Sequence, residues 1–501
     1  MAGDQGLVFA AVDIGASSGR VILGKLTDAG PELVTVHRFP NGVQFLGGAL
    51  RWDVEALFGE VLVGLRAAAE AAALAGDTVA SIGIDTWAVD YGLVDDAGTL
   101  RHLPFSYRDG RTEASVGVVH AALPPERLYA RTGLQFLPFN TVYQLAAERS
   151  LDAVQALLIP DLLAYRLTGE RRTEATNAST TGLLDAATGT WAADLFAPLG
   201  LAPDLFPPLV EPGAVVGTLL PEIAGATGLP GSTQVVAVGS HDTASAVAAV
   251  PASSPDFAYI SSGTWSLVGV ELDAPILTDE SRAANFTNER GVDGTIRYLR
   301  NTGGLWLLQE CLREWGIEGP APDLASLLAA AAELPGGGPT IDADSTGFLA
   351  PDGMPARIRR AALATGQEAP SSREAVVRCI LDSLAEAYAR TLQDAVRLSG
   401  QAIDVIHVVG GGSQNALLCQ LTADRTEVPV LAGPVEATAL GNILVQARAA
   451  GLVAAGPGLA GIREAARAAA SPVRYEPSGR VTPPTGAPSA PMGYLHDAPA
   501  R

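Results

Sequence analysis

A short strand–turn–strand unit occurs twice in the chain, once near its start and once near its middle. Residues 7–13 (LVFAAVD) form an apolar run that ends in Asp, and the small turn IGASSGR and the apolar segment VILGKL follow. Residues 257–270 repeat the pattern as FAYI, SSGT and WSLVGV, about 250 residues further along a chain of 501 residues. A unit that returns at half the chain length predicts two related domains, although a chance likeness between two common hairpins stays open.

Further apolar runs that end in Gly or Asp alternate with helical patterns. The strand candidates are residues 79–85, 235–242 and 403–412. Apolar side chains at helical spacing predict a helix over residues 371–399, with Ser371 and Glu374 as a capping box and Gly400 as its end. This alternation predicts an α/β fold whose sheets are mostly parallel and buried on both faces.

Charge and lysine content exclude several classes of protein. The net charge of −21 disfavours nucleic acid and anionic membranes as partners. Lys25 is the only lysine, and Leu26 follows it, so the chain has no P-loop. The His-Arg-Asp loop of protein kinases is also missing.

Metal-site, export and membrane signals are missing as well. The six histidines and three cysteines form neither HExxH nor CxxC. The first residues, MAGDQG, lack the basic and apolar regions of a signal peptide, and no apolar run reaches the length of a membrane span. We therefore expect a cytoplasmic protein of a reducing compartment.

The first turn has the composition of a phosphate-binding loop. Small residues let backbone N–H groups surround phosphate oxygens, and hydroxyl groups and a guanidinium add further donors. Asp13 ends the strand, where a carboxylate can hold Mg²⁺ directly or through water. The candidates for phosphate are Ala16, Ser17, Ser18, Gly19 and Arg20. An ordinary Gly/Ser hairpin turn has the same composition, so both interpretations stay open.

Three further turns carry polar or glycine-rich sequences after apolar runs. Residues 261–265 could face the first turn and bind a polyphosphate from the other side of a cleft. Asp242 is placed either to accept a hydroxyl proton in phosphoryl transfer or to cap the following helix, and His241 fits an orienting role. The glycines of residues 410–415 let a flat ring or a ribose approach the backbone, or form a flexible turn.

Taken together, these segments resemble the FGGY family of carbohydrate kinases, from about residue 8 to about residue 450. The matching segments are VDIGASSGRVILG, IGIDTWAVDYGL, GLQFLPFNTVYQL, IPDLLAYRLTGE, SHDTASAVAAVP, ISSGTWSLVGVE, NFTNERGVDGTIRYLRNTGGLWLLQECL and HVVGGGSQN with GPVEATALGNILVQA. Several of them are particular to the branch of the family that acts on L-rhamnulose.

The resemblance implies two ribonuclease-H-like domains of the actin/Hsp70/sugar-kinase type, with ATP and the sugar in the cleft between them. We expect a sugar-binding domain over residues 1–245, a nucleotide-binding domain over residues 246–475, and a disordered Pro/Gly-rich tail over residues 476–501. The implied reaction is transfer of the ATP γ-phosphate to the 1-hydroxyl of L-rhamnulose, with Mg²⁺, in L-rhamnose catabolism. It needs no covalent enzyme intermediate.

The resemblance also implies a role for individual residues. Asp242 is the general base, Asp13 organises Mg²⁺, and Thr264 joins Ala16 to Arg20 at the phosphates. The other nucleotide-site residues are Gln309, Gly410 and Gly411. The residues expected at the sugar are Asp85, Ala88, His241, Thr243 and Asn301. Ala88 departs from the Gly of many relatives, which leaves the exact ketose open.

Alternative functions remain at this stage. Trp87, Phe136 and Phe139 could contact the methyl group of a 6-deoxy sugar or simply pack in the core. A kinase for L-fuculose or L-xylulose, and an actin- or Hsp70-like interaction protein, share the same turns. A catalytically inactive sugar sensor is disfavoured because Asp13 and Asp242 are both present. All three cysteines lie in the second half, so the first domain can hold no disulfide.

Overall fold

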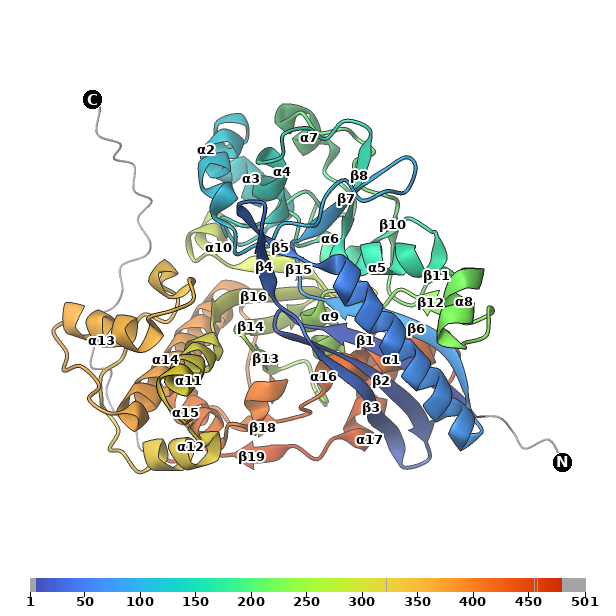
Figure 1. Cartoon of the computed structure of the whole chain (residues 1–501). Helices are drawn as coiled ribbons and strands as arrows, with labels where there is room; N and C mark the ends of the chain where they lie inside the picture. Colours follow the sequence, from blue (N-terminus) through green and yellow to red (C-terminus); the bar gives the residue numbers. More distant parts are fainter. Residues whose placement is uncertain (1–5, 321, 455, 457, 480–501) are drawn as a thin grey trace.

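Two mixed sheets form the centre of the molecule (Figure 1). The computed structural model describes residues 6–320, 322–454, 456 and 458–479; most of the predicted tail, residues 480–501, lies outside the described residues. The first sheet has the order β11 (Val215–Thr218), β12 (Gln234–Val236), β6 (Thr78–Thr86), β1 (Leu7–Ile14), β2 (Ser18–Thr27) and β3 (Gly30–Pro40). The second has the order β15 (Thr287–Arg290), β16 (Ile296–Gly303), β14 (Trp265–Leu272), β13 (Phe257–Ser262), β17 (Val405–Val409), β18 (Val430–Ala432) and β19 (Val473–Tyr475).

The two sheets share one topology. In the first, β1, β2 and β3 are antiparallel neighbours, whereas β6 lies parallel to β1 and β12 parallel to β6. In the second, β13, β14 and β16 repeat the antiparallel part, and β17 and β18 repeat the parallel part. The predicted pair of related α/β domains is therefore confirmed.

Insertions extend each repeated unit. The first half adds β4 (Val43–Leu46), β5 (Ala49–Trp52), β7 (Tyr91–Asp95), α2 (Glu113–Ala122), α3 (Pro125–Thr132), α4 (Thr141–Ala146), β8 (Val154–Leu158), α5 (Ile159–Thr168), β9 (Thr173–Glu174), α6 (Ala175–Ala178), α7 (Ala193–Phe196), β10 (Leu209–Val210) and α8 (Pro221–Thr227). The second half adds α10 (Asp279–Ala283), α11 (Trp306–Glu318), α12 (Leu324–Ala332), α13 (Met354–Ala364) and α17 (Ala460–Ala469).

One long helix in each half follows the antiparallel strands. In the first half this is α1 (Val54–Ala75), and in the second it is α14 (Arg373–Ser399). Helix α14 begins one residue later than the capping box predicted, because Ser372, not Ser371, accepts the N–H of Ala375. It ends as predicted at Gly400, whose φ of 71° is the left-handed conformation that glycine adopts at low cost.

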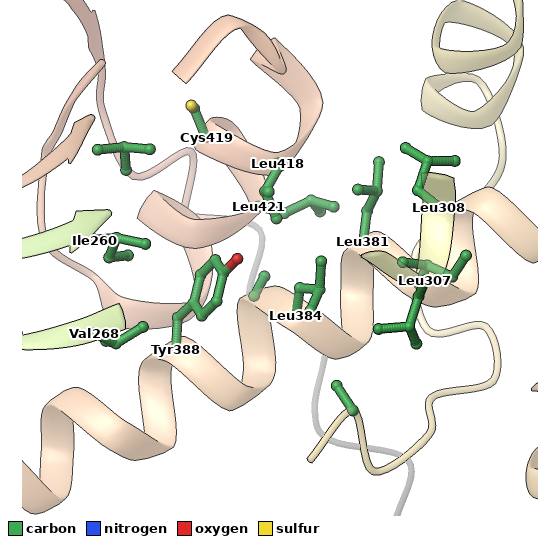
Figure 2. Packing of buried hydrophobic residues seen from close by; sticks show 14 of the residues in the cluster. Ile260, Val268, Leu307, Leu308, Leu381, Leu384, Tyr388, Leu418, Cys419 and Leu421 are labelled. Carbon is green, nitrogen blue, oxygen red and sulfur yellow. The ribbon is translucent and has the colours of Figure 1, made fainter. Parts of the chain in front are cut away.

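The apolar face of α14 forms the core of the second half (Figure 2). Leu384 and Tyr388 lie in one buried cluster with Ile260 of β13 and Val268 of β14. Helix α15 (Ala416–Thr426) also packs on α14, and its Cys419 is buried in this core. Cys311, Cys379 and Cys419 are all free thiols.

The predicted strand over residues 235–242 is wrong after its second residue. Strand β12 ends at Val236, and α9 (Asp242–Ala248) begins where the strand was expected to end. Beyond Val236 only isolated backbone pairing continues, since the N–H of Thr86 donates to the carbonyl of Ser240 at 2.9 Å and Thr86 forms a single bridge with His241. Within this segment the buried Glu174 accepts both the N–H and the hydroxyl group of Ser240 at 3.1 and 2.7 Å. A side chain from a distant segment therefore helps to hold the local conformation.

Two helices join the halves. Helix α9 and α16 (Ala437–Ala449) pack against each other between the sheets; α9 also contacts β13, and α16 lies on β1, β2 and β6 (Figure 1). Small residues permit this close approach. A Cβ atom at Gly441 would lie 1.9 Å from the carbonyl oxygen of Ser245, and one at Gly83 would lie 2.3 Å from Oδ1 of Asn442.

A buried set of polar side chains crosses the same interface. Asn442 Nδ2 donates to Oδ2 of Asp85 at 2.6 Å, and Gln446 Nε2 donates to Oδ1 of Asn442 and to the carbonyl of Ala10. The hydroxyl group of Ser81 donates to Oε1 of Gln446 at 2.7 Å. Because such groups are costly to bury without partners, their pairing fixes how α16 sits on the first sheet.

The close approach at Gly441 predicts a strong effect of one methyl group. Gly441→Ala should lower the free energy of unfolding by about 1–3 kcal/mol, because α16 must move away from α9. Gly59→Ala in α1 is the matched control, since a Cβ there meets nothing within 4 Å and should stabilise the helix by up to about 1 kcal/mol. Urea unfolding of both variants measures the difference, and equal stability would contradict the packing described.

A buried histidine predicts how stability depends on pH. Burial, with Arg463 adding to it, lowers the pKa of His407 on β17 to about 4. The folded protein therefore favours the neutral imidazole of His407. The stability that this ring contributes is complete above the unfolded-state pKa near 6.5, and it is lost as the pH falls to the folded-state pKa near 4. Between pH 7 and pH 4, the free energy of unfolding of His407→Leu should therefore fall by about 3 kcal/mol less than that of wild type, at about 1.4 kcal/mol per pH unit. Urea unfolding at several pH values tests this, and parallel curves would refute it.

Candidate active site

A cavity of about 330 Å³ lies between the two halves, and turns from both of them line it. The β1–β2 turn and the start of α9 face it from the first half. The β13–β14 turn and the loop after β17 face it from the second half. The predicted site residues that line the cavity are Asp13, Ala16, Ser17, Ser18, Arg20, Ala88, His241, Asp242, Thr243, Thr264, Asn301, Gln309, Gly410 and Gly411.

Two of the predicted residues lie outside the cavity lining. Gly19 belongs to β2, and a Cβ atom there would meet the ring of Phe39 at 2.2 Å, so packing accounts for this glycine. Asp85 is fully buried at the end of β6, directly beside Asp13 in the register, and its carboxylate accepts a hydrogen bond from Asn442. Because Asp85 is fully buried and paired with Asn442, the geometry does not favour direct contact between Asp85 and a sugar.

Each of the two candidate phosphate-binding turns is held by a backbone hydrogen bond across the turn. Gly15 N–H donates to the carbonyl of Ser18 at 2.9 Å, and Gly263 N–H donates to that of Trp265 at 2.9 Å. Gly412 packs against Ser262, since a Cβ would lie 2.0 Å from its hydroxyl oxygen. Gly411, by contrast, has nothing within 4 Å of such an atom, so a flat group can approach its backbone.

Carboxylates gather where the strands end. Arg20 donates from Nε to Oδ2 of Asp13 at 3.0 Å and pairs through Nη1 with Glu436 of the second half at 2.6 Å. Burial raises the pKa of Asp13, Arg20 opposes this rise, and the nearby Asp242 adds to it. Burial also raises the pKa of Asp85 well above its usual range, with Asp13 as the next cause. A cation in the cavity would relieve this repulsion.

Asp242 is the first residue of α9, and its side chain is about one-third exposed to the cavity. The predicted alternative, a helix cap, is wrong: the cap position is His241, and no side chain caps this helix. The Asp242 carboxylate accepts from the hydroxyl group of Thr243 at 3.1 Å and lies 3.5 Å from Nε2 of His241. It is therefore available to a ligand in the cavity.

Aromatic side chains also line the cavity. Trp87 and Phe139 line the cavity and also pack on the core of the first half, so both of their predicted roles stay open. Phe136 instead lines a small separate cavity near His120. Val89 also lines the main cavity, with a φ of 66° that is uncommon for a β-branched residue. Thr141 holds that strained segment through a hydrogen bond to the Val89 carbonyl at 2.7 Å.

Asp90 holds Trp87 of this wall and the neighbouring Trp52, which is not part of the lining. Its Oδ2 accepts from Nε1 of Trp52 at 2.6 Å, from Nε1 of Trp87 at 3.0 Å and from the N–H of Tyr107 at 3.1 Å. Burial raises the pKa of Asp90 to about 6, although these donors favour the carboxylate. The wall is therefore positioned by a buried acceptor rather than by apolar packing alone.

Sequence reasoning missed several polar residues of the cavity. Gln135 accepts the backbone and side-chain N–H groups of Asn301 at 2.8 and 3.1 Å, joining the two halves. Glu289 of β15 reaches the cavity beside His241. The available signal was a run of polar residues, Thr287 to Glu289, that is buried between apolar strands. The other missed polar residues of the lining are Asn140, Thr180 and Thr438.

Two absences hold for the part of the chain that the structure describes. No group of three His, Cys, Asp or Glu side chains there is arranged to hold a metal ion. In the same described ranges, no helix is both long enough and apolar enough to span a membrane.

The fold and the cavity define a two-domain α/β protein that binds a ligand between duplicated halves. The model of the FGGY family of carbohydrate kinases, N-terminal domain, matches residues 8–249, and that of its C-terminal domain matches residues 258–450. The chain belongs to the FGGY family of carbohydrate kinases, and is an enzyme of that family.

Similar proteins include two that are named rhamnulokinase. That of Bacteroides thetaiotaomicron is 43% identical over 88% of this chain and 91% of its own length. That of Pectobacterium carotovorum is 46% identical over 89% of this chain and 88% of its own. Among solved structures, a xylulose kinase from Rhodospirillum rubrum has a TM-score of 0.74 at 21% identity, with 94% of each chain covered. Plasmodium falciparum glycerol kinase with ADP has a TM-score of 0.73 at 16% identity, with 95% and 94% covered. These structures show the fold.

Proposed function

We propose that the protein transfers the γ-phosphate of ATP to the 1-hydroxyl of L-rhamnulose, giving L-rhamnulose 1-phosphate and ADP in L-rhamnose catabolism. The observation that carries this proposal is the carboxylate of Asp242, which lines the same cavity as two glycine-containing turns and a set of polar and aromatic side chains. The names of the similar proteins support the choice of sugar.

Asp242 is the general base of the proposed reaction. Its carboxylate removes the proton of the 1-hydroxyl as that oxygen attacks the γ-phosphorus in line, and the bond to the ADP oxygen breaks. Positioning supplies much of the rate, since no covalent intermediate is formed. Closure of the halves around the cavity would keep water from the γ-phosphate.

The β1–β2 turn, the β13–β14 turn and the loop after β17 bind the nucleotide in this proposal. Backbone N–H groups of the first turn, with Ser17 and Ser18, bind phosphate oxygens, Thr264 binds from the opposite turn, and Gly411 accommodates the ring or ribose. Asp13 fits Mg²⁺, because it is a carboxylate in the cavity lining whose pKa is raised by burial and, to a lesser extent, by the nearby Asp242, so that a bound cation would favour its ionised form. The ion, when bound, neutralises charge on the phosphates.

The sugar lies against both halves in this proposal. His241, Thr243 and Asn301 bind its hydroxyl groups, and Trp87 and Phe139 contact its methyl group. The first half, residues 1–245, thus holds most of the sugar site, and residues 246–475 hold most of the nucleotide site. Helix α9 spans the proposed boundary between them.

The substrate is tested by ADP release with Mg²⁺-ATP on L-rhamnulose, L-fuculose, L-xylulose and glycerol. We expect the highest kcat/KM on L-rhamnulose. A higher value on another ketose would keep the kinase and change the substrate, with Ala88 the first residue to examine. ATP binding without any sugar-dependent ADP release would favour the actin-like alternative.

The base is tested by Asp242→Asn. We expect kcat to fall about 10²- to 10⁴-fold, because the amide cannot accept the proton, while the Kd for ATP stays within about threefold of wild type. Asp28→Asn, at an exposed turn, is the matched control and should keep full activity. Wild-type turnover in Asp242→Asn would exclude this residue as the base.

A further inference from the structure

A segment of the first half, residues 133–136, is docked on the second half at three points beside the cavity. Asn288 donates from its N–H and from Nδ2 to the first carbonyl of this segment, at 2.9 and 3.1 Å. Oδ1 of Asn285 accepts the last N–H of the segment at 2.8 Å. Between these two attachments lies Gln135, which bonds to Asn301 of β16. The segment therefore holds a fixed position relative to β16.

Gln135 occupies the place of a strand partner of β16. In the part of the chain that the structure describes, the pairing of β15 with β16 ends at Thr287 opposite Leu299, two residues before Asn301. The N–H of Asn301 donates to Oε1 of Gln135 at 2.8 Å, and Nε2 of Gln135 donates to the carbonyl of Asn301 at 3.3 Å. The side-chain amide thus satisfies both backbone groups of Asn301, as a further residue of β15 would.

The backbone of Asn301 fixes the orientation of both side-chain amides. A backbone N–H only donates and a carbonyl oxygen only accepts, so Oε1 of Gln135 faces the N–H and Nε2 faces the carbonyl. Oε1 also faces the side chain of Asn301, and because an amide oxygen only accepts, the atom there is the donor Nδ2, at 3.1 Å. Oδ1 of Asn301, the acceptor of its amide, is thereby turned away from Gln135.

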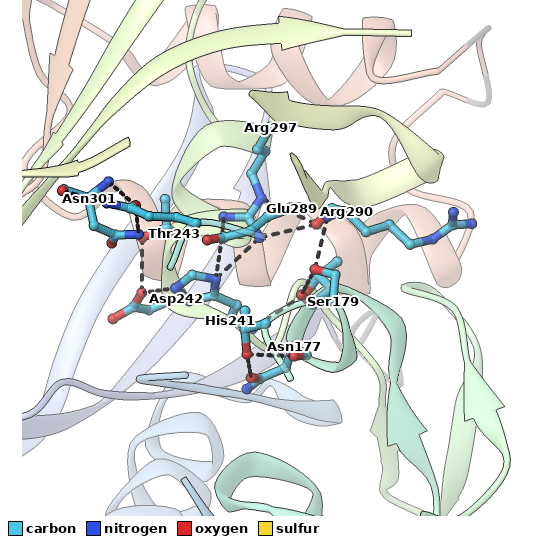
Figure 3. A network of polar contacts seen from close by, with 12 residues as sticks. Asn177, Ser179, His241, Asp242, Thr243, Glu289, Arg290, Arg297 and Asn301 are labelled. Atoms are coloured by element: carbon cyan, nitrogen blue, oxygen red, sulfur yellow. Dashed lines mark hydrogen bonds and ion pairs between the residues drawn. The ribbon is translucent and has the colours of Figure 1, made fainter. Parts of the chain in front are cut away.

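Asn301 lies where a ligand can use that acceptor. It lines the cavity together with His241, Asp242 and Thr243, and Figure 3 shows it on the side of the polar network where Asp242 and Thr243 lie. Gln135 lines the same cavity but is only 4% exposed, whereas Asn301 is half-buried. The buried amide therefore supports the more accessible one beside the carboxylate of Asp242.

We propose that Gln135 is a positioning residue of the sugar site, which holds Asn301 so that Oδ1 accepts a hydrogen bond from a hydroxyl group of the ketose. The group of the sugar at this position must be a donor, so it is a hydroxyl group and not the ketose carbonyl. Because Gln135 belongs to the first half and Asn301 to the second, the acceptor is held only while the two halves are docked. This inference rests on the proposed sugar kinase function.

The role of Gln135 is tested by Gln135→Met, which keeps the length of the side chain and removes its donor and acceptor. We expect the KM for L-rhamnulose to rise about 5- to 50-fold, because Asn301 loses its orientation, while kcat and the KM for ATP change less than about threefold. A residue that served the fold alone would lower the amount of active protein and leave KM unchanged. A wild-type KM for the sugar, or a fall in kcat alone, would overturn the proposal.

Gln367→Met is the matched control. Oε1 of Gln367 accepts the N–H of Thr340 at 2.9 Å, and Nε2 donates to the carbonyl of Thr340 at 2.7 Å, which is the same pair of backbone bonds that Gln135 makes. Gln367 does not line the cavity. Its replacement should lower stability in urea unfolding and leave the KM for the sugar unchanged. An equal rise of this KM in both variants would mean that lost stability is the cause, and would overturn the proposal.

A double-mutant cycle separates positioning from direct contact with the sugar. Asn301→Ala should raise the KM for L-rhamnulose at least as much as Gln135→Met does. If Gln135 acts through the Asn301 side chain, the double variant should show no larger KM than Asn301→Ala alone. Effects that multiply would show that Gln135 binds the sugar independently, and the positioning role would fail.

Gln135→Glu keeps the proposal testable if the methionine variant folds poorly. Burial raises the pKa of a carboxyl group, and a protonated carboxyl donates to the Asn301 carbonyl and accepts from its N–H as the amide does. At about pH 6 we expect a KM for the sugar well below that of Asn301→Ala, and a KM as high as in that variant would overturn the proposal. Wild-type protein without sugar-dependent ADP release would refute the proposed function itself. Active wild type with an unaltered Gln135→Met variant would refute only the role of Gln135.

Discussion

The packing of α16 on the first sheet is the interaction on which the rest of the structure depends. Helix α16 follows the last parallel strand of the second half, yet it lies on β1, β2 and β6 of the first half. The close approach at Gly441 and the hydrogen bonds of Asn442 and Gln446 set its position. Because α9 packs on α16, the two glycine-containing turns face one cavity at a fixed separation.

The same interface concentrates negative charge. Asp13 and Asp85 end neighbouring strands in register, and Asp242 begins the helix beside them. Burial raises the cost of ionising Asp13 and Asp85, and Arg20 offsets only part of this cost for Asp13. In a chain with one lysine, remote from this point, the balance is left to Arg20 and to cations that arrive with a ligand. The electrostatics of the cavity therefore favour a ligand that carries its own counterion.

Local sequence patterns predicted the duplicated halves and the four turns that line the cavity, because these features depend on nearby residues. Other lining residues, such as Ala88, Asn301 and Gln309, were expected only from the resemblance to the family. They failed where a distant side chain decides. The strand expected over residues 235–242 ends at Val236, and in the segment beyond it Ser240 is bound by the side chain of Glu174. Asp85 is turned to Asn442 of the other half, and Glu289 reaches His241 through the pairing of β15 with β16. Contacts between residues so far apart in the chain leave no periodic signal in one sequence.

The crossed helices also bear on how such a chain can arise. Helices α9 and α16 each follow the fifth strand of one repeated unit, and each contacts the sheet of the other unit. A single unit alone would leave that helix face and the matching sheet face open to water, and only a second copy could cover both. The chain thus joins two units of the same strand order in one polypeptide, and each unit supplies a helix that covers part of the other unit's sheet.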